Sequence, residues 1–136
     1  MPTQSLTVAQ ATDENARYVN LIVSEQFDSS DFRDVAQIGC RTNPESLMSE
    51  GPPWSVLTTW VKNAPSAEFV SAALKRLDDL RAEGFHRNPW TRPEPEPTDR
   101  RSYSDDRGFS VTAGLDKRPN GDTVFEVRAK SPCSEP

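Results

Sequence analysis

Two alternating runs joined by a turn signal constrain the fold of this chain most. Residues Gly108–Lys117 and Thr123–Lys130 alternate between apolar and polar side chains, which is typical of strands with one buried face. The five residues between them, Arg-Pro-Asn-Gly-Asp at 118–122, are a strong turn signal. The sequence therefore predicts a β-hairpin here. Because an isolated hairpin is barely stable in water, other elements must cover its apolar face.

An amphipathic helix over Ala67–Glu83 is the natural cover for this hairpin. Ser66 is expected to cap its first turn, and Gly84 to end it in the left-handed conformation. The apolar residues that repeat at helical spacing are Phe69, Val70, Ala73, Leu74, Leu77 and Leu80. We expect this stripe to pack across a sheet.

A second helix is predicted over Asp13–Phe27, with Thr12 or Asp13 as its cap. Ala16, Val19, Val23 and Phe27 would share one face of it. This leaves residues 1–12 as a flexible N-terminal segment and residues 13–133 as a single domain, a size that fits one compact unit.

Two further strands are predicted in the first half of the chain. Trp54–Lys62 is the clearer one, and because both of its faces carry apolar side chains it suits a central position. Val35–Arg41 favours a strand, with a short helix over Phe32–Arg41 as the alternative. Between them, Thr42–Pro53 is expected to be a loop because of its Asn-Pro and Gly-Pro-Pro sequences.

Prolines shape the segment after the long helix. Phe85–Arg92 is predicted to be an irregular or edge strand, since Pro89 interrupts it. Pro93–Pro97 is expected to run as a polyproline-type connector into a turn at 98–101. The predicted class is α+β: an antiparallel sheet of about four to five strands, with the helices at about 67–83 and 13–27 packed on one face.

The two cysteines, Cys40 and Cys133, bear on both stability and compartment. Only 34% of the 136 residues are hydrophobic and twelve are prolines, so the core is lean and a covalent staple would help. A Cys40–Cys133 disulfide would contribute about 4–5 kcal/mol in the chain-entropy model. It would indicate an oxidising compartment. The alternative is two free buried thiols in a cytoplasmic protein.

Charge narrows the classes of partner. The formal net charge is −5, and Lys and Arg are scattered rather than gathered in a stripe, which argues against nucleic acid and anionic membranes. No stretch approaches the length of a transmembrane helix. The first residues do not read as a signal peptide, so the chain is either cytoplasmic as written or the mature part of an exported protein.

Motifs for catalysis, cofactors and metals are not evident. His86 is the only histidine, and at a helix exit it is more typical of a surface residue than of a general base. We therefore expect a non-enzymatic protein with no cofactor and no metal site.

A partner-binding surface is the remaining hypothesis for the site. Its candidate residues are Trp54, Trp60, Trp90, Arg92, Arg100 and Arg101. The tryptophans form either part of the core or an aromatic surface for a protein or glycan, and the proline-rich segment is either a rigid connector or a recognition strip.

The second half of the chain resembles small exported proteins and lipoproteins of actinobacteria. The resemblance rests on the helix ending Leu-Asp-Asp-Leu-Arg-Ala-Glu-Gly-Phe at 77–85 and on Ser131-Pro-Cys133 after the hairpin. It implies an extracytoplasmic location and a cysteine paired with one near the N-terminus, but no activity. The sequence departs from that pattern in lacking a leader and a lipobox cysteine.

The leading functional hypothesis is an exported or envelope-associated protein that binds another protein or a component of the cell envelope. The alternatives are a small acidic cytoplasmic inhibitor of a basic protein, and an enzyme whose site is assembled only in space. The sequence predicts no oligomeric state.

Overall fold

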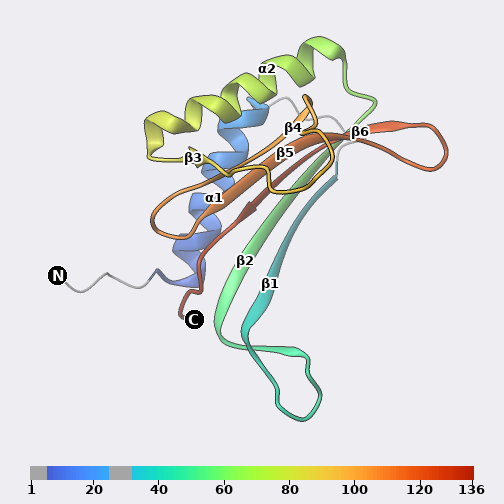
Figure 1. Ribbon diagram of the computed structural model, residues 1–136. Helices are drawn as coiled ribbons and strands as arrows, with labels where there is room; N and C mark the ends of the chain where they lie inside the picture. Colours follow the sequence, from blue (N-terminus) through green and yellow to red (C-terminus); the bar gives the residue numbers. More distant parts are fainter. Residues whose placement is uncertain (1–5, 25–31) are drawn as a thin grey trace.

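The computed structural model describes residues 6–24 and 32–136 (Figure 1). The elements are α1 (Val8–Val23), β1 (Phe32–Thr42), β2 (Ser49–Asn63), α2 (Ala67–Asp78), the 3-10 helix η1 (Asp79–Glu83), β3 (His86–Arg87), β4 (Arg100–Ser104), β5 (Ser110–Lys117) and β6 (Thr123–Lys130). The described strands form one antiparallel sheet of six, in the order β1-β2-β6-β5-β4-β3. The α+β class is confirmed, and the sheet has more strands than the four to five predicted.

The central hairpin is formed as predicted. β5 and β6 pair from Ser110 opposite Lys130 to Lys117 opposite Thr123. Gly121 in the turn has φ 94°, a left-handed conformation that glycine adopts without steric cost. β6 also pairs with β2, so the hairpin lies in the middle of the sheet.

The helix predicted over Ala67–Glu83 is confirmed together with both of its ends. The Ser66 hydroxyl accepts a hydrogen bond from the Phe69 amide at 3.0 Å, and α2 continues into η1. Gly84, with φ 90°, ends the helical run in the left-handed conformation. Local signals settled this element because capping residues and an apolar stripe agree along it.

The first helix begins earlier than predicted. Thr7, and neither Thr12 nor Asp13, is the cap, and it forms a capping box with Gln10. Residues 8–12 are therefore helical rather than flexible. The backbone of Glu135 bonds to Leu6 and Val8, so the C-terminal tail holds this start in place, which no local pattern could reveal. Phe27 lies outside the described residues.

The region after η1 also differs from the prediction. The strand expected over Phe85–Arg92 is reduced to the two residues of β3, because Pro89 and the prolines beyond it cannot donate to a ladder. β4 was not predicted, since the expected turn at 98–101 overlaps its start. It carries one buried apolar side chain, Tyr103, and so has no alternation to detect. Pairing with β5 stabilises it instead.

β1 and β2 form a long hairpin that extends away from the helices (Figure 1). β2 begins at Ser49 and β1 ends at Thr42, so half of the loop predicted over Thr42–Pro53 is strand, and the connection is residues 43–48. The register shifts between Gly39 and Arg41, where β2 passes through its two prolines. A Cβ on Gly39 would lie 2.1 Å from the backbone carbon of Glu50, so the close approach of the two strands requires glycine there.

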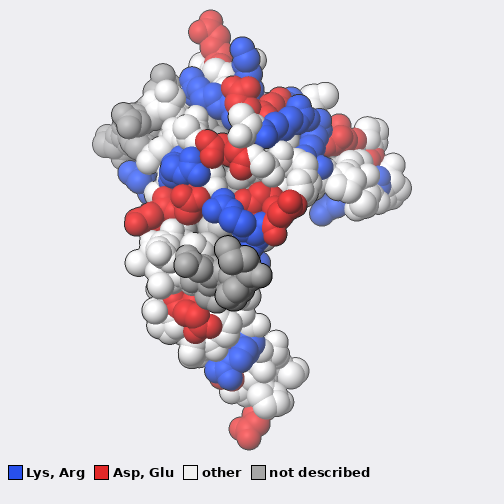
Figure 2. Space-filling model, turned by 90° about the vertical axis from the view of Figure 1, so that its left-hand side faces the viewer, with Lys and Arg blue, Asp and Glu red and all other residues white. Residues whose placement is uncertain are grey.

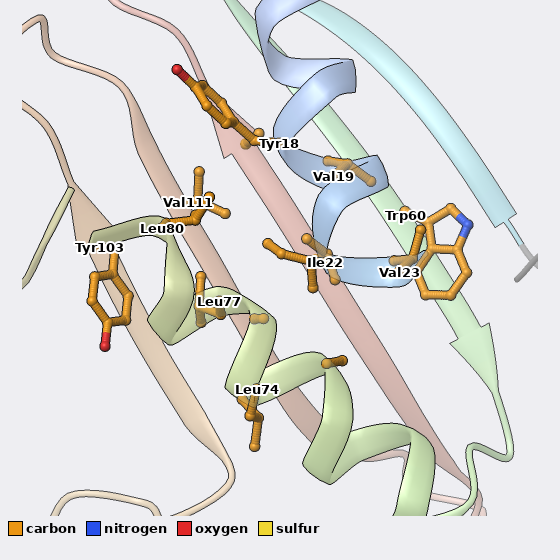
Figure 3. Packing of buried hydrophobic residues seen from close by; sticks show 14 of the residues in the cluster. Tyr18, Val19, Ile22, Val23, Trp60, Leu74, Leu77, Leu80, Tyr103 and Val111 are labelled. Carbon is orange, nitrogen blue, oxygen red and sulfur yellow. The ribbon is translucent and has the colours of Figure 1, made fainter. Parts of the chain in front are cut away.

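Both helices pack on one face of the sheet and enclose the core (Figure 3). Tyr18 and Ile22 of α1, Leu77 of α2 and Val111 of β5 belong to this core, and all four side chains are fully buried. Burying a side chain of this size contributes about 1.5–3 kcal/mol. Over β4, β5 and β6 the other face of the sheet is polar, with ion pairs between Arg100 and Asp116 and between Arg128 and Glu126.

No helix among the described residues is both long and apolar enough to cross a membrane.

Candidate protein-binding surface

Cys40 and Cys133 form a disulfide, as predicted, with 6.1 Å between their Cα atoms. Cys40 lies in β1 and Cys133 in the tail that follows β6. Beside it, the Trp54 amide donates to the Ser134 carbonyl at 2.8 Å, and the Ser134 amide donates to the Trp54 carbonyl at 2.7 Å. The tail therefore ties the β1–β2 hairpin to the body of the domain both covalently and through the backbone.

The three tryptophans do not form a common surface. Trp60 is fully buried in the core, with its ring centroid 6.0 Å from that of Phe69, so the core alternative holds for this residue. Trp54 is half-buried against Gly51 and the tail. Trp90 is 37% exposed in the segment between β3 and β4.

The other four candidate residues, Trp90, Arg92, Arg100 and Arg101, make contacts within the domain. The Trp90 indole donates to the Glu94 carbonyl at 2.6 Å, and the Arg92 guanidinium lies 5.6 Å from the centroid of the Trp90 ring. Arg100 and Arg101 are neighbours in β4 and project to opposite faces, where they pair with Asp116 and Asp78. These contacts favour a rigid connector, and a binding role for the segment stays a prediction.

His86 lies exposed in β3, at the short edge of the sheet. Within residues 6–24 and 32–136 there is no group of three or more His, Cys, Asp or Glu side chains that could hold a metal ion.

Two partly buried polar clusters join the helices to the sheet. Asp78 accepts the Tyr103 hydroxyl at 2.6 Å and also the Arg101 guanidinium. Burial acts to raise the pKa of Asp78, but these two hydrogen bonds outweigh it, and the pKa is lowered. Burial raises the pKa of Tyr103, and its bond to Asp78 raises it further. The cluster fastens α2 to β4 through an ionised carboxylate.

The second cluster lies at α1. Glu14 accepts the Tyr18 hydroxyl at 2.8 Å and pairs with Arg17 and Arg107 at 3.3 Å. The hydrogen bond from Arg17 lowers the pKa of Glu14, with further bonds from Tyr18 and Arg107. Burial raises the pKa of Tyr18. The side chains of this cluster hydrogen-bond to one another, which indicates a structural role.

A hollow with a volume of about 560 Å³ lies between α2 and the end of β5. Its lining includes the apolar side chains of Val70, Leu74 and Leu115 together with Lys75 and the Asp78–Arg101 pair. The hollow is open to solvent, so it would leave much of a small ligand in water.

Exposed apolar side chains gather on the β1–β2 hairpin instead. The described residues expose seven large apolar side chains, of which only Leu21 and Trp90 lie elsewhere. The five on the hairpin are Phe32 (56%), Val35 (54%), Ile38 (36%), Leu47 (76%) and Met48 (69%). Single exposed apolar residues are ordinary, but a concentration on one element is typical of an interaction site.

The charge distribution also favours an interaction site on the β1–β2 hairpin. On the face in Figure 2, Lys and Arg are interspersed with Asp and Glu over the body of the domain. The projecting hairpin, at the lower end of the same view, carries few charged residues. A surface with low charge is more easily desolvated in a protein interface.

β1 also presents an open backbone edge. It is the terminal strand of the described sheet and pairs there only with β2. The backbone groups of Trp54 and Val56 bond to the tail, away from β1. Because hydrogen bonding alternates along an antiparallel pair, the residues opposite them, Gly39 and Gln37, direct their amides and carbonyls outward, and so does Val35. Such an edge can accept another strand.

This surface is not apparent from the sequence alone. Leu47 and Met48 fell in a segment predicted to be a loop, where a solvent-exposed leucine gives no signal. Val35 and Ile38 fit a short helix as well as a strand, and neither pattern predicts that they are exposed. Val35 is exposed because the helices lie over other strands of the sheet, whereas Ile38 lies on the opposite face, which the helices do not cover.

Comparison with known proteins adds little. No protein-family model and no curated protein matches the chain. Among solved structures, CalU16 from Micromonospora echinospora aligns with 76% of this chain and 70% of its own, at 18% identity and a TM-score of 0.33. Similarity at that level supports no argument about function.

Proposed function

We propose that this is a non-enzymatic, exported or envelope-associated protein that binds another protein through the tip of its β1–β2 hairpin. The observation that carries the proposal is the pair Leu47 and Met48, which are 76% and 69% exposed at the end of the hairpin. Apolar side chains of this size insert into a partner's pocket and contribute much of the binding energy of an interface.

The tip is preorganised by its own hydrogen bonds. The Asn43 side-chain oxygen accepts the amides of Glu45 and Ser46 at 2.9 and 3.0 Å. The Asn43 amide donates to the Met48 carbonyl at 2.8 Å. A loop held in one conformation loses little entropy when it binds, which increases affinity.

Leu47 adopts an uncommon backbone conformation. Its φ is 63°, in the left-handed region that residues other than Gly, Asn and Asp seldom occupy. Such strain is of the order of 1–2 kcal/mol and tends to persist where function requires it. An exposed leucine in a strained turn is difficult to explain by stability, and recognition supplies a reason for it.

The disulfide supports an exported or envelope-associated location. Disulfides persist in oxidising environments and are rare in the cytosol. Cys133 is exposed to solvent, so a reducing cytosol would have access to the bond. The alternative, an acidic cytoplasmic inhibitor, would require the domain to be stable without this disulfide.

Site-specific photo-crosslinking in the source organism tests the proposal. A photoreactive phenylalanine analogue replaces Leu47 in one variant and Asn120, in the polar β5–β6 turn, in the control. The expected result is one discrete heteromeric adduct from position 47 that is lost when Met48→Ser is added. Equal labelling from both positions, or no heteromeric adduct from position 47, would overturn the proposal.

A further inference from the structure

We infer that two copies of this protein pair through the edge of β1, antiparallel, with the two-fold axis at Val35. This inference concerns the same hairpin as the proposed function but uses its base rather than its tip. It would extend the six-stranded sheet of each copy into one continuous sheet across the dimer.

The backbone of β1 is suited to this pairing. Val35 and Gln37 direct their amides and carbonyls away from β2, as derived above from the bonds of Trp54 and Val56. With the axis at Val35, the two copies of that residue exchange both of their backbone hydrogen bonds. Each Gln37 then lies opposite position 33 of the other copy.

The exposed side chains of β1 match each other in this register. Phe32 lies opposite Ile38 of the second copy, and Val35 lies opposite its own counterpart. The three exposed apolar side chains of the strand, 56%, 36% and 54% accessible, therefore all meet apolar partners. Cross-strand apolar pairs of this kind stabilise a sheet, and self-complementarity is what a two-fold interface requires.

Charged residues also fit this register. Arg33 lies opposite Gln37, and Asp34 lies opposite Ala36, so no like charges face each other. The neighbouring registers that keep the two faces of the sheet continuous are worse. An axis at Gln37 places Arg33 opposite Arg41, and an axis at Ala36 places Asp34 against Ile38.

The position of the helices leaves room for the second sheet. α1 makes its sheet contacts mainly with β2 and β6, which leaves the outer side of β1 beyond the helix pair (Figure 1). In an antiparallel dimer the two hairpins run in opposite directions, so their tips at Leu47 lie at opposite ends. The dimer would thus present two separate binding tips, and avidity would follow for a clustered partner.

A proline substitution at the edge tests the pairing. The amide of Gln37 points outward, so Gln37→Pro removes a donor from the new interface while it spares the β1–β2 ladder. Gln37→Ala is the matched control. Sedimentation or light scattering should give twice the mass of the 15.2 kDa chain for the wild type and for Gln37→Ala, and the single mass for Gln37→Pro. Circular dichroism and the urea midpoint of dilute samples check that the proline variant is folded.

Cysteine crosslinking tests the register. Two Val35→Cys chains would place their new cysteines directly opposite, about 5.5 Å apart at Cα, within the range of a disulfide. Two Gln37→Cys chains would place theirs four residues apart along the strands, about 13 Å, which is too far. We expect covalent dimers from Val35→Cys alone, with the Cys40–Cys133 bond intact by peptide mapping.

Specific results would overturn the inference. A monomeric wild type at high micromolar concentration, or a dimer that Gln37→Pro leaves unchanged, rules out this interface. Covalent dimers from Gln37→Cys instead of Val35→Cys rule out the axis at Val35. Failure here is distinct from failure of the proposed function, because substitutions at Leu47 should abolish the heteromeric adduct without changing the mass of the dimer.

Discussion

The hydroxyl of Tyr103 donates to Asp78 at 2.6 Å, which joins β4 to the end of α2 inside the fold. The ion pair of Arg101 with the same carboxylate adds a second polar contact between the strand and the helix. The lowered pKa of Asp78 means that the folded state favours its ionised form. The contribution to stability is therefore present above the ordinary pKa of an aspartate and is lost as pH falls through the lower pKa of the folded state.

We expect Asp78→Asn to destabilise the protein at pH 7, and the difference from the wild type to shrink as pH falls below about 4, the ordinary pKa of Asp. Urea unfolding at a series of pH values between 7 and 2.5 measures this. Asp79→Asn is the control, since Asp79 is the exposed neighbour at the helix end. A difference that stays constant with pH would show that ionisation of Asp78 contributes nothing.

Removal of the disulfide should weaken the whole domain. The bond closes a loop with a sequence separation of 93, so Cys40→Ser with Cys133→Ser should lower the free energy of unfolding by about 2–5 kcal/mol. Urea unfolding with and without reductant is the measurement. Reductant should bring the wild type to the stability of the double variant and leave that variant unchanged. A wild type insensitive to reductant would contradict the assignment.

The cap of α1 can be tested by comparing two threonines. Thr7→Ala removes the hydroxyl that accepts the Gln10 amide at 3.1 Å, and should cost about 1 kcal/mol. Thr12→Ala changes a residue whose hydroxyl only bonds back to the Val8 carbonyl within the helix, and should cost much less. Thermal unfolding monitored by circular dichroism compares them. A larger effect at Thr12 would indicate that the helix begins where the sequence alone predicted.

The bulge in the β1–β2 hairpin should be intolerant of any side chain at Gly39. Gly39→Ala places a carbon 2.1 Å from the Glu50 backbone, so we expect the free energy of unfolding to fall by about 1–3 kcal/mol or the β1–β2 hairpin to be displaced. Gly121→Ala is the comparison, because nothing lies within 4 Å there and only the left-handed φ is penalised, at about 1 kcal/mol. Hydrogen exchange of the β1 amides distinguishes the two variants, since only Gly39→Ala should increase exchange in the β1–β2 hairpin.

The sequence and the structure agree best where local signals are strong. The β5–β6 hairpin, the helix from Ser66 to Gly84 and the strand that contains Trp60 each carry periodicity together with a turn or cap residue. The Cys40–Cys133 pairing could also be inferred, because a lean core and only two cysteines leave few alternatives. These features determined the α+β class without knowledge of long-range contacts.

Only the tertiary structure decided the remaining features. The start of α1 depends on the tail at Glu135, and β4 exists because β5 pairs with it. The exposure of Val35 and Leu47 depends on which strands the helices cover and on how far the hairpin extends beyond them. Such features arise between residues far apart in the chain, whereas local periodicity reports only neighbours within a few turns. The sequence by itself therefore determined the elements with strong periodicity, and the packing decided the others and which side chains stay exposed.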